Sequence, residues 1–501
     1  MGTEIQQDHF TEADHARFKQ RLQQGLAALK TVLARPGFGQ GPRSLGTEVE
    51  LFLVDAQARP LAVSQEVVHA AHNPLITPEM GSFDIELSTP PVALAGRPFE
   101  ALGRAIRQTM GEIRRRAAAR GARIVPISIL PTFRRQDFHP RAITDLPRYR
   151  ALAAGLSRLR QAPFHICIDG DEPLELMSND PAMEGANTAF QVHLRLAPDE
   201  FARLFNAALL LTAPALAAAG NSPTFLGHRL WHETRVALFK QAGDDRPPGN
   251  EENWRRPARI SFGNGWVRDG AAELFSESVA LYEPLLPVCT PDEDNQDDVA
   301  CAEAGGVPKL NELRLHHGTV WTWNRPVYDT ADGGHLRVEL RALPAGPTVD
   351  DMLANAAFLV GGILGVDPDV ADLLPSLPFA LAERNFYRAA QHGLAAQLVW
   401  PRGVGAAPES VSARALMLSL LPHAERGLLA GGVEGDEVSR LLGIIEARVS
   451  SGITGSVWQL RTLAALEGAG ATRHEALREM LERYIAQVDS GQPVHAWPIA
   501  G

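Results

Sequence analysis

The segment GTEVELFLVD, residues 46–55, alternates charged and apolar side chains along most of its length. Its polar positions are Glu48 and Glu50, and its apolar positions are Val49, Leu51 and Leu53. Side chains two residues apart in a strand point to the same face of a sheet. We therefore expect this segment to form a strand with one acidic face and one apolar face.

Three further segments repeat this pattern, at residues 83–88, 191–196 and 336–341. Their polar positions are Asp84, Glu86, Gln191, His193, Arg195, Arg337, Glu339 and Arg341. A half-solvated sheet is sufficient to explain the alternation in any one of these strands. Carboxylates are nevertheless depleted in strands, and like charges on one face repel each other unless a cation lies between them.

A hard divalent cation would satisfy such a face. Mg²⁺ and Mn²⁺ prefer oxygen ligands and also bind phosphate oxygens. Arginine and histidine side chains on the same face would then hold the phosphate. The four segments together favour an α+β fold in which helices pack on the apolar side of a sheet and the charged side lines an open cleft.

The composition of the 501-residue chain is that of an ordinary globular protein, with 45% hydrophobic and 21% charged residues. Because its net charge is −11, we expect no nucleic-acid partner. We also expect no membrane span and a cytoplasmic location, since no segment holds about 18 uninterrupted apolar residues. The three cysteines, Cys167, Cys289 and Cys301, are too widely spaced for a disulfide framework or a structural zinc site.

We expect an N-terminal helical segment at 1–43, alternating strand-like and helical patterns to about residue 345, and a helical C-terminal region at 401–501. Residues 11–34 predict an amphipathic helix, and from residue 347 onward the apolar spacing is almost entirely helical. We expect long loops at 243–258 and 287–307. Thr472 and Glu475 predict a capping box at the start of the last long helix.

Seven short segments, in order along residues 44–400, resemble the glutamate-cysteine ligase family of carboxylate-amine ligases. They are GTEVELFLVD at 46–55, IELSTPP at 85–91, QVH at 191–193, AAGNSPTFLG at 218–227, TRVALF at 234–239, HHGTVWTWNRP at 316–326 and LRVELRALPAGPT at 336–348. None of them is decisive alone. The resemblance implies a catalytic domain at 44–400 with a largely antiparallel sheet like that of glutamine synthetase.

The resemblance also implies roles for individual residues. The metal ligands would be Glu50, Glu86 and Glu339, with Glu48 beside them and His193 near the metal and phosphate. Arg341 would contact phosphate, and Arg235 and Arg325 would bind substrate carboxylate or phosphate. The small-molecule partners would be ATP, an amino acid and an amine.

The chain departs from the family pattern in one region that precedes QVH. Relatives carry a glycine-led G-x-H-V-H segment where this chain has FQVHLRL, and residues 164–187 before it read as an insertion. The role of His165 in that insertion is open. These departures concern which acid and which amine are joined more than the type of reaction.

The expected reaction forms an amide from a carboxylate and an amine through an acyl phosphate made from ATP. Such chemistry needs positioning and charge neutralisation rather than a nucleophilic side chain. No glycine-rich loop precedes any lysine, and neither a G-x-S-x-G elbow nor an H-E-x-x-H helix is present. The γ-carboxyl of glutamate and the amine of cysteine are the first expected substrates.

Several alternatives remain open on the sequence. The ligase could join a different acid or amine, or the chain could be a catalytically silent homologue that binds or regulates. A metal-dependent hydrolase would need a closer histidine and carboxylate set. Each carboxylate could instead form a structural ion pair with Arg195, Arg337 or Arg341, and His193 could be an ordinary sheet histidine. We expect His316 and His317 to be structural at a strand start, with a ligand role as the alternative. We expect Trp321 and Trp323 to pack, with the lining of a substrate pocket as the alternative.

Overall fold

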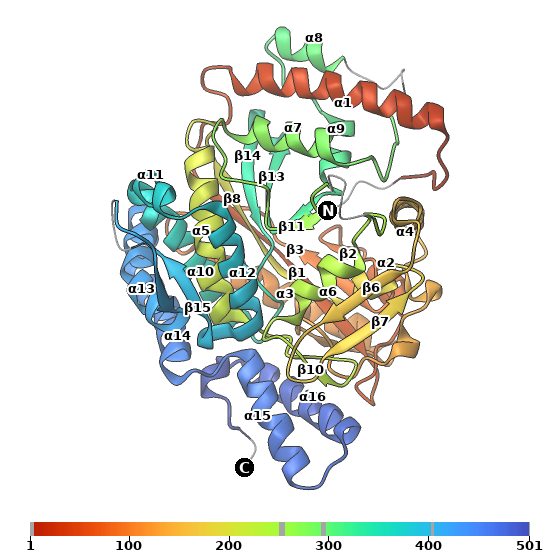
Figure 1. Ribbon diagram of the computed structural model, residues 1–501, viewed down its shortest axis with the longest axis vertical. Helices are drawn as coiled ribbons and strands as arrows, with labels where there is room; N and C mark the ends of the chain where they lie inside the picture. The colour runs from red at the N-terminus through yellow and green to blue at the C-terminus, as the bar shows by residue number, and fades with distance from the viewer. Residues whose placement is uncertain (1–4, 250–255, 292–296, 402–404, 500–501) are drawn as a thin grey trace.

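The computed structural model of the protein describes residues 5–249, 256–291, 297–401 and 405–499. Within these residues, eight strands form one antiparallel sheet at the centre of the molecule (Figure 1). The strand order is β13 (Asn324–Asp329), β14 (His335–Leu340), β8 (Phe190–Leu196), β1 (Ser44–Val54), β3 (Asp84–Ser88) and β2 (Ile76–Pro78). Two short strands, β4 (Val92–Ala93) and β5 (Arg123–Val125), also pair with β1.

The four segments predicted from alternation are β1, β3, β8 and β14, and their bounds agree with the prediction to within two residues. The α+β fold with a largely antiparallel sheet is therefore confirmed. These strands are also neighbours, so their polar positions form rows across one face. The register places Glu50 opposite Glu86, Glu48 opposite Gln191, and Glu339 opposite both His193 and Arg325.

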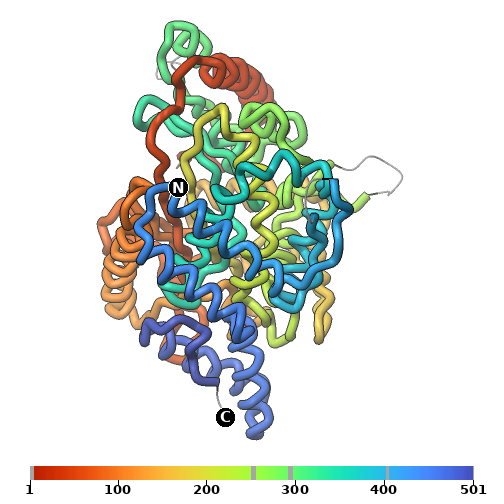
Figure 2. The backbone as a smooth tube through the Cα atoms, turned by 90° about the vertical axis from the view of Figure 1, so that its left-hand side faces the viewer, coloured from red at the N-terminus to blue at the C-terminus, as the bar shows by residue number. Residues whose placement is uncertain are grey.

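The apolar positions of the sheet lie against helices. Val49, Leu51 and Leu53 of β1 are fully buried, and helices α3 (Pro98–Ala118), α5 (Phe201–Ala219) and α10 (Val349–Val366) contact the sheet strands. Helices α13 (Ala413–Ala430) and α14 (Gly435–Ser451) pack on α10 and form an outer layer, drawn in blue in Figure 2.

Two core segments are long and apolar enough to cross a membrane by composition alone. They are Phe201–Ala219 and Val349–Ser376, and 89% and 83% of their apolar windows are buried inside the protein. Core helices of globular proteins have the same composition, so these segments are weak evidence for a membrane span. The cytoplasmic location stays a prediction.

The predicted N-terminal helix is confirmed as α1 (Glu12–Leu33), which begins at a capping box between Thr11 and Asp14. The predicted loop at 287–307 is only partly a loop, because it contains the short helix α8 (Asp298–Glu303). The Asp297 side chain accepts hydrogen bonds from the amides of Val299 and Ala300 and so caps α8. Residues 292–296 of this loop and 250–255 of the loop at 243–258 lie outside the described residues.

The C-terminal region is mostly helical, but a hairpin interrupts it. Strands β15 (Gln397–Trp400) and β16 (Glu409–Ser412) pair across the expected boundary at residue 400. The helical spacing missed them because Asn385, on the preceding helix, fixes the backbone of Val399 by two hydrogen bonds. The predicted capping box of Thr472 and Glu475 is confirmed at the start of α16 (Arg473–Ser490). The domain boundaries stay predictions, and one apolar core extends from Ile5 to Val449.

The remaining elements surround the sheet. The helices are α2 (Ser64–Ala71), α4 (Pro147–Arg160), α6 (Thr234–Ala242), α7 (Ala271–Leu281), α9 (Asn311–His317), α11 (Val370–Leu373), α12 (Phe379–His392) and α15 (Gly455–Gly468). The other strand pairs are β6 (Phe164–Ile168) with β7 (Leu174–Ser178), β9 (Thr224–Phe225) with β10 (His228–Arg229), and β11 (Ile260–Ser261) with β12 (Trp321–Thr322). The segment interpreted as an insertion is thus the β6–β7 hairpin followed by the 3₁₀ helix η3 (Ala182–Ala186).

The paired histidines occupy a different place from the one expected. His316 and His317 end helix α9 instead of starting a strand. Both are buried, and burial lowers the pKa of His316 to about 4 and that of His317 to about 3. They are therefore neutral core residues, as the structural interpretation predicted.

Candidate active site

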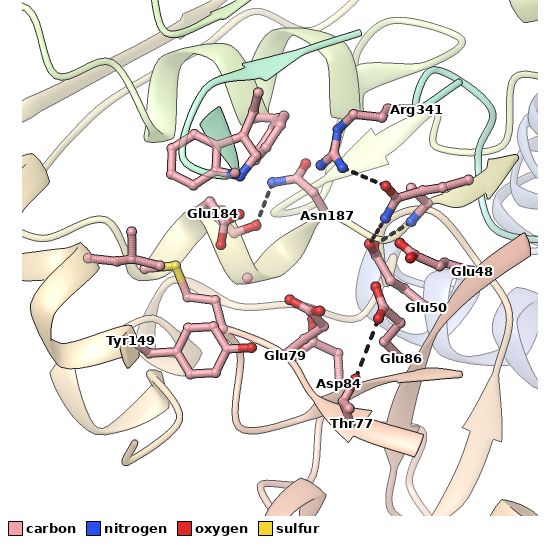
Figure 3. A pocket seen from close by; sticks show the side chains of 18 of the residues that line it. Glu48, Glu50, Thr77, Glu79, Asp84, Glu86, Tyr149, Glu184, Asn187 and Arg341 are labelled. Atoms are coloured by element: carbon pink, nitrogen blue, oxygen red, sulfur yellow. Dashed lines mark hydrogen bonds between the residues drawn. The ribbon is translucent and has the colours of Figure 1, made fainter. Parts of the chain in front are cut away.

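The charged face of the sheet lines a cavity, and Figure 3 shows part of its wall. Seven of the eight residues singled out from the sequence line this cavity: Glu48, Glu50, Glu86, Arg235, Arg325, Glu339 and Arg341. The eighth, His193, lies within 4 Å of Glu48 and Glu339 on the neighbouring strand. The four alternating strands thus bring together residues that are almost 300 positions apart.

Glu339 is held between two arginines. Arg325 donates from Nε to Oε2 at 2.5 Å and from Nη2 to Oε1 at 3.1 Å, and Arg341 donates to Oε1 at 3.0 Å. Burial raises the pKa of Glu339, but the charges of Arg325 and Arg341 outweigh it and hold the pKa at about 2. Glu339 is consequently ionised at every working pH. Its ion-pair partners include Arg325, which the sequence did not suggest.

Glu50 and Glu86 face each other across the β1–β3 pair without an arginine between them. Glu50 accepts hydrogen bonds from the Ala189 amide at 2.6 Å and from Gln191 Nε2 at 2.8 Å. Glu86 accepts a long one from Thr77, at 3.4 Å. Burial and then the charge of Glu86 raise the pKa of Glu50 to about 8. Burial, followed by the charges of Glu48 and Glu79, raises the pKa of Glu86 well above its usual range.

His193 occupies the centre of the sheet face between two carboxylates. Its Nε2 lies 3.2 Å from Glu48 Oε1 and 3.9 Å from Glu339 Oε1. Arg337 donates from Nε to Nδ1 at 3.1 Å, which assigns the ring proton of the neutral imidazole to Nε2. Nε2 thus faces Glu48 at 3.2 Å but makes no hydrogen bond to a described residue. To ligate a metal through Nε2, His193 would have to release Arg337 and change tautomer.

One group of ligand atoms is close enough for a single metal ion. Among the described residues, Glu48, His193 and Glu339 are the only histidine, cysteine or acidic residues that bring three such atoms within 4.8 Å of one another. Glu50 and Glu86 would contribute to a separate position. The donor set, dominated by carboxylate oxygens, fits Mg²⁺ or Mn²⁺. The metal roles stay predictions.

Arg235 makes more contacts within the protein than the sequence suggested. Its guanidinium is 3% exposed and pairs with Glu233, from Nε to Oε1 at 2.9 Å. It also donates to Ser128 Oγ at 3.1 Å and lies 5.2 Å from the centre of the Trp323 ring. Arg235 therefore supports the cavity wall, and its binding of substrate stays a prediction.

The cavity contains functional candidates that the alternation rule could not find. The additional acidic residues are Glu79, Asp84 and Glu184, and the additional aromatic residues are Tyr149, Trp321 and Trp323. Glu79 lies between β2 and β3, and Glu184 lies in η3, within the segment interpreted as an insertion. Residues in loops and short 3₁₀ helices carry no period of two, so only their acidic character could have pointed to them. Trp321 and Trp323 line the cavity, which agrees with the alternative of pocket lining that the sequence left open.

His165 and Arg195 do not line the cavity. His165 is exposed on the β6–β7 hairpin, where its Nε2 lies 2.9 Å from Glu175 Oε1. The Arg195 guanidinium points to the far end of its strand, where it donates to the Gln40 carbonyl. The open question about His165 is thus settled in favour of a surface position.

Comparison with known proteins places this chain in a family. The profile described as Glutamate-cysteine ligase family 2 matches residues 44–483. The chain belongs to this family. The resemblance drawn from the seven segments is therefore confirmed, and the match extends through the C-terminal helices to α16.

The chain is also similar to individual curated proteins, at about 30% sequence identity over part of its length. Two curated proteins named "Putative glutamate--cysteine ligase 2", from two strains of Pseudomonas aeruginosa, are 30% identical over 220 residues and 31% identical over 177 residues. These matches cover 42% and 34% of this chain and 46% and 40% of the relatives. The chain thus spans less than half the length of the curated relatives it matches.

A solved structure has a similar fold. The glutamate–cysteine ligase of Francisella tularensis, solved in complex with AMP, aligns over 90% of each chain with a TM-score of 0.55 and 12% identity. At this identity the comparison shows the shared fold alone.

Proposed function

We propose that this protein is an ATP-dependent ligase that joins a carboxylate to an amine through an acyl phosphate. The observation that carries the proposal is the cavity itself, in which buried carboxylates and arginines converge on one face of a family-typical sheet. Glutamate, through its γ-carboxyl, is the proposed donor, and cysteine is the first acceptor to test. The location is proposed to be cytoplasmic.

The charges of the cavity suit a reaction between anions. ATP and a carboxylate repel each other, and the carboxylates of the wall would repel both. Mg²⁺ or Mn²⁺ held by Glu48, Glu50, Glu86 and Glu339 would neutralise phosphate and wall charge together. Burial, together with neighbouring carboxylates, raises the pKa values of Glu50 and Glu86, and a bound divalent cation would offset both effects, which supports this donor set.

The arginines of the same wall would position the reacting groups. Arg341 extends from the end of β14 over the cavity and donates to Gln191 Oε1 at 2.5 Å as well as to Glu339. Its Nη2 group makes no hydrogen bond to the described residues and is available to a phosphate oxygen. Arg341 would hold the γ-phosphoryl group while the donor carboxylate attacks phosphorus and displaces ADP. The amine would then attack the acyl carbon of the acyl phosphate, displace phosphate and lose a proton.

The experiment is a coupled assay of ADP release in the presence of ATP, Mg²⁺ and L-glutamate, with single amines added in turn and product mass followed in parallel. We expect amine-dependent ADP release and a γ-glutamyl amide. Glu339→Ala should abolish both. Full activity in Glu339→Ala would contradict the assignment of the site.

The same assay tests the alternatives. Release of ADP by an amine other than cysteine keeps the ligase and changes its acceptor. The close set of Glu48, His193 and Glu339 also suits a metal-dependent hydrolase, which would release phosphate at the same rate without any amine. The absence of metal-dependent ATP binding and of turnover would make the silent homologue the better description.

A further inference from the structure

A second acidic group lies in the cavity apart from the sheet carboxylates. Resting on the ligase function proposed above, we propose that Glu184 and Asn187 form a binding site for a substrate ammonium group. Two substrates carry such a group: the acceptor amine and the α-ammonium of glutamate. The observations concern unpaired acceptor atoms, their spacing and their place in the cavity.

Glu184 and Asn187 present oxygen acceptors that have no donor within the described chain. Asn187 donates from Nδ2 to the carbonyl oxygens of Glu184 at 2.8 Å and Met183 at 3.3 Å. This fixes the orientation of the amide, so the other atom, Oδ1, is an acceptor, and it is buried without a hydrogen-bond partner. No hydrogen bond from a described residue reaches the Glu184 carboxylate, and burial raises its pKa to about 7.

Two more unpaired carboxylates lie beside Glu184. Asp84 is 2% exposed, lines the cavity and has a buried Oδ1 without a partner. Burial and then Glu50 and Glu184 raise the pKa of Glu79 to about 8. Two buried acceptors of this wall, Asn187 Oδ1 and Asp84 Oδ1, thus have no donor among the described residues, and a ligand that supplies several N–H groups and positive charge would satisfy them.

The close approach of these groups is built into the backbone. Gly185 lies against Gly81, since a Cβ atom on Gly185 would come within 2.8 Å of the Gly81 Cα. A Cβ on Gly81 would come within 2.5 Å of the Asp84 carboxylate. Any larger residue at either position would push η3 away from the loop between β2 and β3. The two glycines thus allow Glu184 to approach Asp84 and Glu79.

The spacing favours an ammonium group over a metal ion. A bound Mg²⁺ lies about 2.1 Å from each oxygen ligand, so its ligands lie within about 4.2 Å of one another. Glu79, Asp84 and Glu184 do not bring three ligand atoms within 4.8 Å, a spacing that only the His193 group meets among the described residues. An ammonium group donates hydrogen bonds to acceptors at about 2.8–3.0 Å and therefore spans acceptors that are farther apart.

The place of Glu184 in the cavity separates it from the proposed metal ligands. In Figure 3, Glu184 lies on the side of Tyr149, whereas Glu48, Glu50, Glu86 and Arg341 lie on the other side. The lining of the same cavity also includes the apolar residues Met80 and Leu152 and two tryptophans. Phosphate, an anion, is unsuited to the acidic end at Glu184, and a primary amine suits it.

The test compares Glu184→Gln with the wild-type enzyme, using L-cysteine, methylamine and hydroxylamine as nucleophiles. Hydroxylamine traps an acyl phosphate as a hydroxamate, and unlike the other two it is uncharged at neutral pH. Loss of one charged hydrogen bond should raise the KM for a cationic amine by about tenfold to a hundredfold. The KM for hydroxylamine, ATP and Mg²⁺ should remain as in the wild type.

Two further variants serve as controls. Glu184→Asp keeps the charge and should recover most of the affinity for the amine. Glu175→Gln changes an exposed glutamate of the adjoining β6–β7 hairpin and should change neither KM. Thermal unfolding of all variants checks that they are folded.

The outcomes distinguish the two sources of the ammonium group. A raised KM for amine alone assigns the site to the acceptor, whereas a raised KM for glutamate alone assigns it to the donor. Unchanged KM values for both substrates in an active Glu184→Gln enzyme would overturn this inference and leave the ligase standing. Failure of the wild-type enzyme to form hydroxamate or amide would overturn the proposed function, and this inference with it.

Discussion

Glu86→Gln is expected to make the metal-free protein more stable while abolishing its activity. Glu86 is 4% exposed, its only hydrogen bond from a described residue is the 3.4 Å contact from Thr77, and it lies opposite Glu50 in the sheet. Glutamine has nearly the same shape without the charge. The substitution therefore removes repulsion and loses little packing.

The magnitude follows from the spacing of the two strands. Side chains directly opposite in an antiparallel pair are about 5 Å apart, and two unit charges at that distance repel by about 3 kcal/mol at an effective dielectric constant of about 20. We expect a gain of about 1–3 kcal/mol in the free energy of unfolding. For a chain of this length such a gain raises the melting temperature by about 1–3 °C.

The gain in the free energy of unfolding of Glu86→Gln should increase as the pH rises. The folded-state pKa values of Glu86 and Glu50 are raised above the usual value of 4.5, and that of Glu50 reaches about 8. Their ionisation therefore opposes folding, and the penalty grows as the pH rises from about 4.5 to 8. The gain in Glu86→Gln should be largest near pH 8.5 and should disappear near pH 4.5.

Glu339→Gln provides a matched control on the same sheet face. Its folded-state pKa is lowered to about 2, so its ionisation stabilises the protein above about pH 4.5, and this contribution is lost as the pH falls toward 2. Removing its charge at pH 7 leaves Arg325 and Arg341 without their anion and should cost about 2–3 kcal/mol. Glu86→Gln and Glu339→Gln should thus shift the free energy of unfolding in opposite directions, although both substitutions abolish ligase turnover.

The assay is thermal unfolding in EDTA and in Mg²⁺ at pH 5.5, 7 and 8.5. Wild-type protein should gain more from Mg²⁺ at pH 8.5 than at pH 5.5, and Glu86→Gln should lose most of that gain. A destabilised Glu86→Gln at pH 8.5 in EDTA, combined with an unchanged response to Mg²⁺, would refute the reasoning and make the carboxylates structural.

Two other substitutions test residues that we expect to play no part in the active site, one on the surface and one in the core. His165→Ala should leave turnover unchanged and alter the free energy of unfolding by less than about 0.5 kcal/mol, because the pairing of His165 with Glu175 is exposed. A loss of activity in the coupled assay would show that the β6–β7 hairpin contributes to the active site. Arg448→Ala removes a fully buried partner of Asp351, at 2.6 Å, and should cost about 3–5 kcal/mol in urea unfolding without changing the KM for ATP. A raised KM for ATP in that variant would show that this ion pair is coupled to the cavity.

The sheet and its acidic face could be predicted from the sequence because side chains two residues apart in a strand point to the same face. In GTEVELFLVD both the buried and the functional side chains follow that period, so one segment specifies the strand, its orientation and two candidate ligands. The order of the strands could not be predicted in this way. The adjacency of Glu339 and His193 depends on pairings between β8 and β14, which are far apart in the sequence.

The other half of the cavity could not be predicted, for physical reasons that apply to loops. Glu79 and Glu184 belong to segments without regular repeats, and their approach depends on the contact between Gly81 and Gly185. The β6–β7 region read as an insertion because it departs from the family pattern, and its contribution to the cavity comes from η3, a single short turn. The ion pair between Arg325 and Glu339 could not be predicted, because nothing in the sequence shows that the two residues lie opposite each other. The binding of substrate by Arg325 stays a prediction.

The cavity carboxylates therefore fall into two classes that differ in how their ionisation affects the stability of the fold. Glu339 stabilises the fold through Arg325 and Arg341, and a structural role alone would be enough to retain it. Glu50, Glu86, Glu79 and Glu184 have raised pKa values and destabilise the ionised, empty protein. A protein that only needed to fold would gain stability by replacing them. The metal ions proposed at the sheet and the ammonium group proposed beside Glu184 would account for their presence in one cavity.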